Sequence, residues 1–381
     1  MNESIQLPVP ESRPDLLIVS GEHSGDQHAA SMLTDLRQRM PGATVCALGG
    51  DALRAAGAQV IFDLVDHSVV GFVEVLKNYG FFKELFDATV EWIHAYRPRA
   101  ICFVDYPGFN LRLAERLVKE GLAAKGGGEI KLLYYISPQI WAWKGHRRFK
   151  MAELLDSLAV IFPFEIESYA DTDLPVEFVG HPFVADEFDL GLTYDPDGPI
   201  LLLPGSRLAP VGRIFPVQLK AFLAFAKSHP ECRAVTLYPS ETVRILLEKL
   251  IAEAGAQGRV ELLPADAPIA ASAVLTSSGT MSLKVALAGI PGCIVYRANL
   301  WTYLLARTLV KIPYLGIANL LLRRAAYPEY LQGAAKALPL ATELERVVAT
   351  REPMSAAPEL RELLGEGQAN GAGEWLARWM A

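Results

Sequence analysis

The strongest constraint on the fold is a series of short, continuously apolar segments, each followed by a turn and then by a helical pattern. The first four expected strands end near Gly, Ser or Asp and cover residues 15–20, 43–48, 100–104 and 131–136. Strands that are apolar throughout belong to a sheet covered on both faces, and the helical segments between them supply the crossovers that parallel strands need. The pattern therefore predicts a doubly wound parallel α/β domain.

The pattern restarts after residues 174–197, a segment rich in Pro, Asp and Gly that is typical of a linker between domains. Four further expected strands follow, at residues 199–203, 234–238, 260–263 and 290–296. We expect an N-terminal domain of residues 1–185, joined by the C-terminal tail of about residues 356–381, and a C-terminal domain of residues 186–355. The fold class is thus α/β, with two Rossmann-like domains whose parallel sheets face each other across a cleft. This is the GT-B architecture of many nucleotide-sugar transferases, although a periplasmic-type binding protein or a UDP-sugar epimerase fits the pattern equally well.

Net charge and cysteine content argue against several other classes of protein. The net charge of −7 argues against a nucleic-acid-binding surface, which needs a basic stripe. The four cysteines are far apart and form no CxxC or Cys/His cluster, so neither a disulfide framework nor a zinc site is expected. The polar N-terminus lacks an apolar signal segment, and no uninterrupted apolar run is long enough to span a bilayer. We therefore expect a soluble, cytoplasmic protein.

Two loops in the N-terminal half carry candidate catalytic and binding residues. The sequence GEHSGD, residues 21–26, follows the first strand and opens a helix, so its backbone N–H groups lie at the positive end of the helix dipole. It matches neither the Walker nor the GxGxxG pattern, and a plain helix cap by Ser24 or Asp26 is the alternative. Asp105 directly follows the strand at 100–104. A carboxylate at this end of a strand points into the ligand crevice of an open parallel sheet. It is either a general base for an attacking sugar hydroxyl or a cap of the following turn.

An aromatic and basic segment follows the strand at 131–136. Trp141 and Trp143 flank a small residue. Four basic residues come after them: Lys144, His146, Arg147 and Arg148. Aromatic faces suit sugar or acyl surfaces, and the basic residues suit phosphate. Packing against the sheet is the alternative, but it explains one tryptophan better than the pair with its basic neighbours.

Two loops of the C-terminal half form a candidate diphosphate site. In LPGSR, residues 203–207, the small residues allow close backbone approach and Arg207 offers a fork of donors. Ser278, Gly279 and Thr280 start a helix whose N-terminus attracts negative charge. Both loops follow strands of one domain, so together they form a plausible diphosphate site. A solvated arginine is the alternative for Arg207.

The segment 69–86 is apolar with few charges, and it has more large apolar residues than one buried helical face needs. An interfacial segment would place its apolar side in a bilayer. The residues expected to contact acyl chains or a membrane are Val73, Leu76, Phe81, Phe82 and Leu85. Core packing is the alternative for such a stripe.

These motifs resemble, in type and in order, those of the lipid-A-disaccharide synthase family. The family's segments correspond to GEHSGD at 21–26, VVGFVEVL at 69–76, VDYPGF at 104–109 and YISPQIWAWK at 135–144, of which the last is the most specific. Further matches are FPFE at 162–165, FVGHP at 178–182, LLPGSR at 202–207, SGTMSL at 278–283, ALAGIP at 286–291, Tyr296 with Arg297, LVKIPY at 309–314, Asn319, and PEYLQ at 328–332. The resemblance covers about residues 16–332.

The resemblance implies a GT-B enzyme that joins UDP-2,3-diacylglucosamine to 2,3-diacylglucosamine-1-phosphate with inversion at the anomeric carbon. The products would be the β(1→6) disaccharide 1-phosphate and UDP. It also implies no metal or other cofactor, peripheral contact with the inner membrane, and a homodimer. Asp105 matches the family's base. The implied substrate-binding residues are Glu22, Ser24, Arg207, Ser278, Gly279, Thr280, Arg297, Asn319, Glu329 and Gln332.

Three residues depart from the family pattern. Lys284 stands where members carry a Glu expected to accept hydrogen bonds from the nucleotide ribose, and lysine only donates. Pro210 replaces a Glu shortly after GSR, and Gly108 replaces the second Asp of VDYPGF. Lys284 and Pro210 motivate a second hypothesis, a catalytically weakened homologue that binds lipid or lipid phosphate without turnover. A third is another enzyme of the same fold, such as a UDP-N-acetylglucosamine epimerase or another lipid glycosyltransferase, against which the WAW and VVGFVEVL segments argue.

Overall fold

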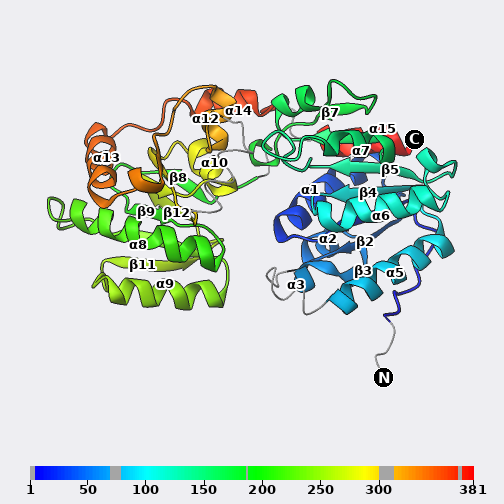
Figure 1. Cartoon of the computed structure of the whole chain (residues 1–381), viewed down its shortest axis with the longest axis horizontal. Helices are drawn as coiled ribbons and strands as arrows, with labels where there is room; N and C mark the ends of the chain where they lie inside the picture. The colour runs from blue at the N-terminus through cyan, green and yellow to red at the C-terminus, as the bar shows by residue number, and fades with distance from the viewer. Residues whose placement is uncertain (1–4, 69–78, 186–187, 300–312, 368–370) are drawn as a thin grey trace. The chain divides into compact units, whose positions relative to one another are not determined.

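The computed structural model describes residues 5–68, 79–185, 188–299, 313–367 and 371–381. Within it the chain divides into two compact units (Figure 1). Unit 1 comprises Met1–Asp186 and Leu364–Ala381, and unit 2 comprises Glu187–Leu363. Each unit is built on a parallel sheet covered by helices, as the apolar strands predicted.

Unit 1 contains a seven-stranded parallel sheet in the order β3-β2-β1-β4-β5-β6-β7. Its strands are β1 Leu16–Ser20, β2 Val45–Gly49, β3 Gln59–Asp63, β4 Ala100–Val104, β5 Lys131–Tyr135, β6 Ser157–Val160 and β7 Val176–Phe178. β1, β2, β4 and β5 lie where apolar segments predicted strands. Ser20 is in register with Val104, which is in register with Tyr135. The loops that follow β1, β4 and β5 therefore leave the sheet at one edge.

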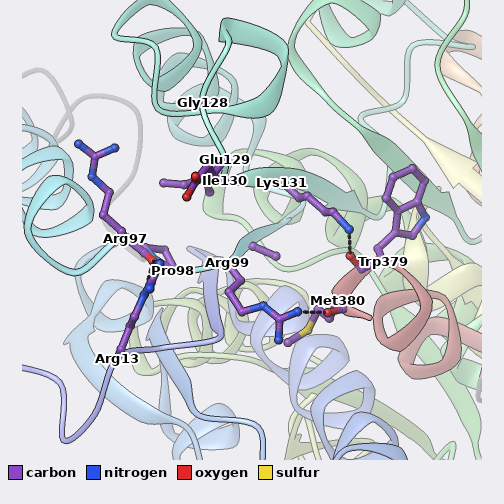
Figure 2. Close-up of a pocket in the computed structure, with 11 residues that line it drawn as sticks. Arg13, Arg97, Pro98, Arg99, Gly128, Glu129, Ile130, Lys131, Trp379 and Met380 are labelled. Carbon is purple, nitrogen blue, oxygen red and sulfur yellow. Dashed lines mark hydrogen bonds between the residues drawn. The ribbon is translucent and has the colours of Figure 1, made fainter.

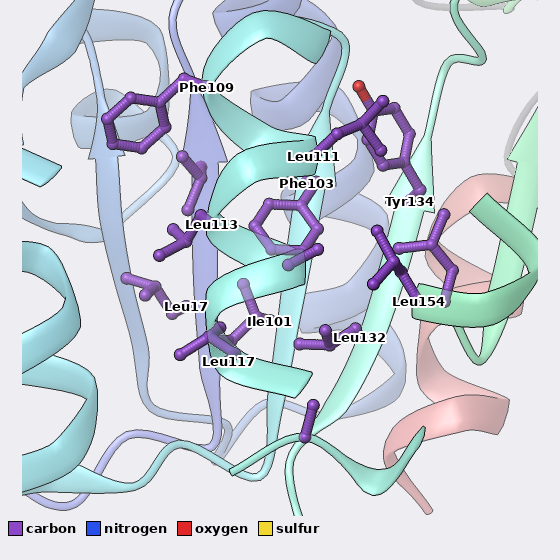
Figure 3. Packing of buried hydrophobic residues seen from close by; sticks show 14 of the residues in the cluster. Leu17, Ile101, Phe103, Phe109, Leu111, Leu113, Leu117, Leu132, Tyr134 and Leu154 are labelled. Carbon is purple, nitrogen blue, oxygen red and sulfur yellow. The ribbon is translucent and has the colours of Figure 1, made fainter. Parts of the chain in front are cut away.

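Helices cover this sheet and fix the loops at its edge. They are α1 His23–Arg39, α2 Asp51–Ala55, α3 Leu64–Ser68, α5 Tyr79–Tyr96, α6 Pro107–Lys119, α7 Arg147–Leu154 and α15 Gly371–Met380. Figure 3 shows Ile101 and Phe103 of β4 among the side chains of α6, where Leu113 and Leu117 recur one turn apart. Phe103 is fully buried, and truncating a buried Phe costs about 3–5 kcal/mol. This packing holds the loop between β4 and α6 in place.

The C-terminal helix α15 belongs to unit 1 although it comes last in the chain. Trp375 is fully buried, and its Nε1 donates a 2.9 Å hydrogen bond to Ser157 Oγ. At the C-terminal end of the helix, Lys131 Nζ donates to the Trp379 carbonyl at 2.7 Å and Arg99 Nη2 donates to the Met380 carbonyl at 2.8 Å (Figure 2). Cations at the carbonyls of a helix C-terminus stabilise the helix.

A cavity of about 320 Å³ lies beside these two cations, at the amino ends of β4 and β5 (Figure 2). Arg13 and Arg97 also line it. Arg13 Nε and Nη2 donate to the carbonyl of Arg97 at 3.3 Å, and Arg97 Nε donates to that of His94 at 3.1 Å. Backbone carbonyls thus engage all four cations, and two of these cations, Lys131 and Arg99, hold the end of α15.

Unit 2 contains a six-stranded parallel sheet in the order β11-β10-β9-β13-β14-β15, and a parallel pair, β12-β8. Its strands are β8 Leu192–Tyr194, β9 Ile200–Leu203, β10 Ala234–Tyr238, β11 Val260–Pro264, β12 Ile269–Ala271, β13 Ala273–Thr276, β14 Gly292–Tyr296 and β15 Glu329–Leu331. Its helices are α8 Leu208–Phe225, α9 Glu241–Glu253, α10 Thr280–Leu287, α12 Ile317–Leu322, α13 Ala337–Thr350 and α14 Ala357–Leu363. Leu203 and Thr276 are in register, so β9 and β13 end level with each other.

Helix α8 is, within the described residues, long and apolar enough by length and composition to cross a membrane. We had expected no such segment from the sequence. Nine of its side chains are buried, including Phe215 and Phe222 in the core of unit 2. Packing inside the unit therefore accounts for its apolar character.

Two strands lie inside residues 174–197, which the sequence predicted as a linker. β7 forms one edge of the sheet in unit 1, and β8 pairs with β12 in unit 2. Each has three residues with a polar residue in the middle. Such short edge strands lack the continuous apolar pattern of central strands. The linker prediction is wrong over these residues.

Candidate active site

In unit 1 the strand order reverses between β1 and β4, which are neighbours in the sheet although β2 and β3 come between them in the chain. Open α/β sheets bind ligands at such a reversal, outside the carboxyl ends of the strands. Glu22 follows β1 and Asp105 follows β4. The structure thus places both predicted residues at the ligand-binding edge of this sheet.

Asp105 lies in a strained backbone turn. Asp105 and Tyr106 both have left-handed conformations, with φ of 46° and 47°, which costs non-glycine residues on the order of 1–3 kcal/mol each. The side chains of Asn110 and Tyr134 hold the turn by donating to the Asp105 carbonyl at 2.7 and 2.5 Å. The Asp105 N–H donates to the carbonyl of Tyr135 at 3.1 Å. Strain that is held in this way is typical of functional sites.

The Asp105 carboxyl is suited to exchange a proton near neutral pH. Burial raises the pKa of Asp105 to about 7, the charge of Glu22 adds to the rise, and the backbone N–H of Tyr106 opposes it. A general base works best when its pKa lies near the operating pH. No side chain caps α6, so a helix cap finds no support. The hydrogen bond from the Tyr106 N–H is a contact that a cap of the turn would make, and that alternative stays open.

The loop after β1 does not form the side-chain helix cap that was one of its two interpretations. Glu22 is the N-cap residue of α1, and no side chain caps this helix. Asp26 lies in the first turn of α1, and its buried side chain reaches the start of α2. There its carboxylate accepts hydrogen bonds from the N–H groups of Gly50 at 2.7 Å and Ala52 at 2.9 Å. A cap of α1 by Ser24 or Asp26 is therefore wrong. Glu22 and Ser24 are exposed at the open N-terminus of α1.

The two tryptophans of the loop after β5 have different surroundings. Trp141 packs edge-to-face on Phe164, with 5.2 Å between ring centroids, so the packing alternative holds for it. Trp143 is 48% exposed. Lys144 Nζ lies 4.2 Å from the centre of its ring, and the Arg147 guanidinium carbon lies 5.8 Å from it. The loop thus presents an aromatic ring with two cations.

A second buried carboxyl, that of Glu165, lies near the site. Its Oε2 accepts a 3.1 Å hydrogen bond from the Phe162 N–H. Burial raises the pKa of Glu165 to about 8 against this hydrogen bond, and the charge of Asp105 adds to the rise. The sequence had suggested no role for Glu165, Asn110 or Tyr134. A polar hydroxyl within an otherwise apolar strand is a signal that could have found Tyr134, while Asn110 and Glu165 lie in helical turns without such a signal.

In unit 2 the strand order reverses between β9 and β13, and the two predicted phosphate loops follow these strands. The Ser277 N–H donates to the Leu203 carbonyl at 2.7 Å. A Cβ added to Gly205 would lie 3.5 Å from Ser277 Oγ. The structure therefore brings these loops into contact.

Both loops lead into helix N-termini that no side chain caps. Arg207 is the exposed N-cap residue of α8, and Gly279, with φ of 133°, is that of α10. Ser278 is half-buried and Thr280 is exposed beside it. Uncapped N–H groups and a guanidinium are suited to bind an anion such as a diphosphate.

Asn319 and Glu329 are bonded to each other inside unit 2. Glu329 accepts hydrogen bonds from the N–H groups of Leu315 and Gly316, each at 2.9 Å, and from Asn319 Nδ2 at 2.9 Å. The Asn319 side chain, which is fully buried, also donates from Nδ2 to the Tyr327 carbonyl at 2.7 Å and accepts at Oδ1 from the Tyr327 N–H at 2.9 Å. Asn319 therefore joins α12 to the strand β15, and its contact with the substrate stays a prediction.

Arg297 and Gln332 follow the ends of β14 and β15. Arg297 Nη2 donates to the Ala335 carbonyl at 2.7 Å, while its buried Nε has no partner among the described residues. The Gln332 amide pairs with the backbone of Ala298: its nitrogen donates to the Ala298 carbonyl and its oxygen accepts from the Ala298 N–H, each at 3.3 Å. Both side chains thus hold the backbone at the carboxyl edge of this sheet.

A family model described as Lipid-A-disaccharide synthetase matches residues 16–364. The chain belongs to the lipid-A-disaccharide synthase family. Lipid-A-disaccharide synthase 1 of Legionella pneumophila is 34% identical over 379 residues, covering 93% of this chain and 94% of the relative. The lipid-A-disaccharide synthase of Anaeromyxobacter dehalogenans is 37% identical over 379 residues, covering 94% and 95%. The expected class is thus confirmed: this synthase is a hexosyltransferase of lipid A biosynthesis.

Solved structures confirm the fold class. A putative UDP-N-acetylglucosamine 2-epimerase from Listeria monocytogenes has a TM-score of 0.63 and 10% identity, covering 96% of this chain and 95% of that one. The glycotransferase of kitacinnamycin has a TM-score of 0.59 and 12% identity, covering 97% and 100%. At such identities the likeness shows the fold alone, which is the α/β fold of GT-B transferases and related epimerases.

The three departures from the synthase pattern have different surroundings. Lys284 is half-buried with its Nζ 5.1 Å from the centre of the Phe188 ring, and burial lowers its pKa against the charge of Asp189. Gly108 is exposed, and a Cβ added there would meet nothing within 4 Å. Pro210 lies in the first turn of α8, where a missing N–H costs little.

The apolar segment of the synthase is described only from Tyr79 onward, so Val73 and Leu76 lie outside the described residues. Leu85 is fully buried in the core of unit 1, which supports the alternative of core packing for this residue. Phe82 packs partly buried against the same core. Phe81 is half-buried and stacks on the His67 ring at 5.1 Å.

Proposed function

We propose that this synthase transfers 2,3-diacylglucosamine from UDP to the 6-hydroxyl of 2,3-diacylglucosamine 1-phosphate, with inversion at the anomeric carbon. The products are the β(1→6) disaccharide 1-phosphate and UDP. Family membership supports the substrate class. The observation that carries the proposal is the Asp105 carboxyl at the reversal between β1 and β4, with a pKa of about 7.

In the proposed reaction the Asp105 carboxylate takes the proton of the acceptor hydroxyl while that oxygen bonds to the anomeric carbon. The bond between this carbon and the UDP oxygen breaks on the opposite face, so the configuration inverts. The departing diphosphate gains negative charge. Arg207 and the N–H groups at the starts of α8 and α10 are suited to stabilise that charge.

The test is incubation of the purified protein with both lipids in a non-ionic detergent. We expect a disaccharide monophosphate, identified by its mass, whose anomeric proton shows the large coupling of a β linkage. An α-linked product contradicts inversion, and the absence of any disaccharide contradicts the proposed activity.

Lys284 favours a second candidate, a homologue that binds lipid or lipid phosphate without turnover. It occupies the position of the family's carboxylate, and its ammonium group lies over the Phe188 ring. Calorimetry with UDP separates the two candidates. Measurable UDP binding supports the transferase, whereas no UDP binding combined with retained binding of the acceptor lipid supports the homologue.

We also propose that the synthase works peripherally at the cytoplasmic face of the inner membrane, as a homodimer. The half-buried side chain of Phe81 on α5, which lies outside the core cluster of unit 1, supports the membrane contact. Flotation with phospholipid vesicles and sedimentation equilibrium test these two points. A protein that stays out of the vesicle fraction contradicts the first, and a monomer contradicts the second.

A further inference from the structure

The segment after the tryptophan pair carries five basic residues within seven positions: Lys144, His146, Arg147, Arg148 and Lys150. Carboxylates neutralise two of them. Arg148 makes a two-pronged ion pair with Asp171, with both N–O distances at 2.6 Å, and Lys150 Nζ lies 2.6 Å from Glu115 Oε2. Arg148 Nη1 also donates to the Gly145 carbonyl at 2.7 Å and so helps to hold the loop. Lys150 therefore serves as the internal reference for the others.

Lys144 and Arg147 have a different environment. Both lie against the ring of Trp143, and neither forms an ion pair with a carboxylate in the described part of the chain. An aromatic ring orients a cation without neutralising its charge. Two positive charges thus lie within 5.8 Å of the centre of one exposed ring, in a chain whose net charge is −7. Such a pair is suited to bind a phosphate dianion.

The pair lies close to the predicted base. Its loop follows β5, the neighbour of β4 in the sheet, and leaves at the same edge as Asp105. Burial raises the pKa of Tyr134, and the positive charge of Arg147 opposes this rise. The hydroxyl of Tyr134 in turn donates to the Asp105 carbonyl at 2.5 Å. Arg147 is therefore within electrostatic reach of a group that touches the Asp105 turn.

We infer that Lys144 and Arg147 bind the phosphate of the acceptor lipid while Asp105 acts on its hydroxyl. This inference rests on the proposed function. The acceptor carries its phosphate on C1 and its reacting hydroxyl on C6, at opposite ends of one sugar ring. A phosphate site must accordingly lie beside the base and not on it. Lys144 and Arg147 occupy such a position, and they set which hydroxyl of the sugar reaches Asp105.

The kinetic test compares Lys144→Ala, Arg147→Ala and the double variant with Lys150→Ala in non-ionic micelles. Each lost charge-assisted hydrogen bond costs about 1.5–3 kcal/mol, which corresponds to roughly a 10- to 150-fold higher KM for the acceptor. The KM for the UDP-sugar should stay within about twofold. The Lys150→Ala control should leave both constants unchanged, and equal effects from the test variants and this control overturn the inference.

Two further measurements identify the source of the phosphate. An acceptor that lacks the 1-phosphate should be a poor substrate for the wild type, and the double variant should use both acceptors equally badly. Sedimentation with vesicles of phosphatidylglycerol or phosphatidylcholine tests the bilayer instead. If the double variant loses only its binding to the anionic vesicles, and keeps its acceptor KM in micelles, the inference is overturned.

Failure of the proposed function is distinguishable from failure of this site. If the wild type makes no disaccharide, the site is tested by tryptophan fluorescence during titration with the acceptor lipid, with Trp143→Phe as the reference. A signal that needs Trp143 and is lost in the double variant supports the phosphate site without any turnover. An identical titration for wild type and double variant overturns it.

Discussion

Gly21 packs so closely on Tyr106 that a Cβ added to the glycine would lie 2.5 Å from Cδ1 of the tyrosine ring. Gly21 begins the loop after β1, and Tyr106 follows Asp105 in the loop after β4. The ring of Tyr106 thus fills the space that a side chain would need. This contact joins the two loops at the strand-order reversal of unit 1.

We predict that Gly21→Ala displaces the Tyr106 ring and, with it, the Asp105 turn. Overpacking of this kind costs about 1–3 kcal/mol, so the denaturant midpoint and kcat should both fall. Gly108→Ala is the matched control, because an added Cβ there meets no atom within 4 Å. Equal behaviour of the two variants would count against a role for the Gly21–Tyr106 contact.

We expect Glu22→Gln to move the pH profile of the reaction. The negative charge of Glu22 helps to raise the pKa of Asp105 to about 7. Activity that needs the Asp105 carboxylate should rise with pH through about 7, and removal of the Glu22 charge should shift this rise to lower pH. The measurement is kcat/KM from pH 5 to 9 at constant ionic strength. An unchanged profile, matching that of the exposed control Glu167→Gln, contradicts the coupling.

The same pKa affects stability. The folded Asp105 keeps its proton up to about pH 7, while the unfolded chain loses it near the ordinary aspartate pKa of 3.8. The folded state therefore binds more protons in between, and the contribution of Asp105 to the free energy of unfolding falls as pH rises from about 4 to 7. Asp105→Asn should remove this fall in urea titrations across that range.

Lys284→Glu should strengthen the binding of UDP. A carboxylate at this position accepts hydrogen bonds, whereas the lysine ammonium only donates. The nearby charge of Asp189 will oppose part of the gain. Calorimetry with UDP measures the change, and Lys284→Gln separates the effect of an acceptor from that of charge. Weaker UDP binding in Lys284→Glu would show that the lysine itself serves the nucleotide.

The anchor of the C-terminal helix should contribute to the stability of unit 1. Lys131→Ala and Arg99→Ala each remove a cation from the last carbonyls of α15 and should lower the free energy of unfolding by about 0.3–1 kcal/mol. Trp375→Ala removes a fully buried side chain and should cost about 3–5 kcal/mol. Urea denaturation measures all three, and a Trp375→Ala loss no larger than that of Arg99→Ala would show that α15 does not dock through its tryptophan.

Central strands could be predicted from the sequence because continuous burial requires continuous apolar side chains. β1, β4 and β9 are buried along their whole length and appear as apolar runs. β13 is equally buried, but its four residues are A, V, L and T, too short and too small to be distinguished from neighbouring small residues. The strand order also had to come from the structure, because hydrogen bonding between distant strands leaves no local pattern.

A site residue could be predicted only where its role follows from its neighbours in the sequence. Asp105 could be found because it directly follows a buried strand. Asp26 was misassigned because its partner Gly50 is 24 residues away. The hydrogen bond from Tyr134 to Asp105 likewise joins residues 29 positions apart, so the local sequence around either residue does not predict it.

The most direct test of the account is the rate of disaccharide formation by Asp105→Asn with both lipid substrates. The substitution keeps the shape of the side chain and removes its ability to take a proton. Loss of a general base should lower kcat by about 10²- to 10⁴-fold, with the circular dichroism spectrum and thermal midpoint of a folded protein retained. Turnover within tenfold of the wild type would contradict the assignment of Asp105 as the base.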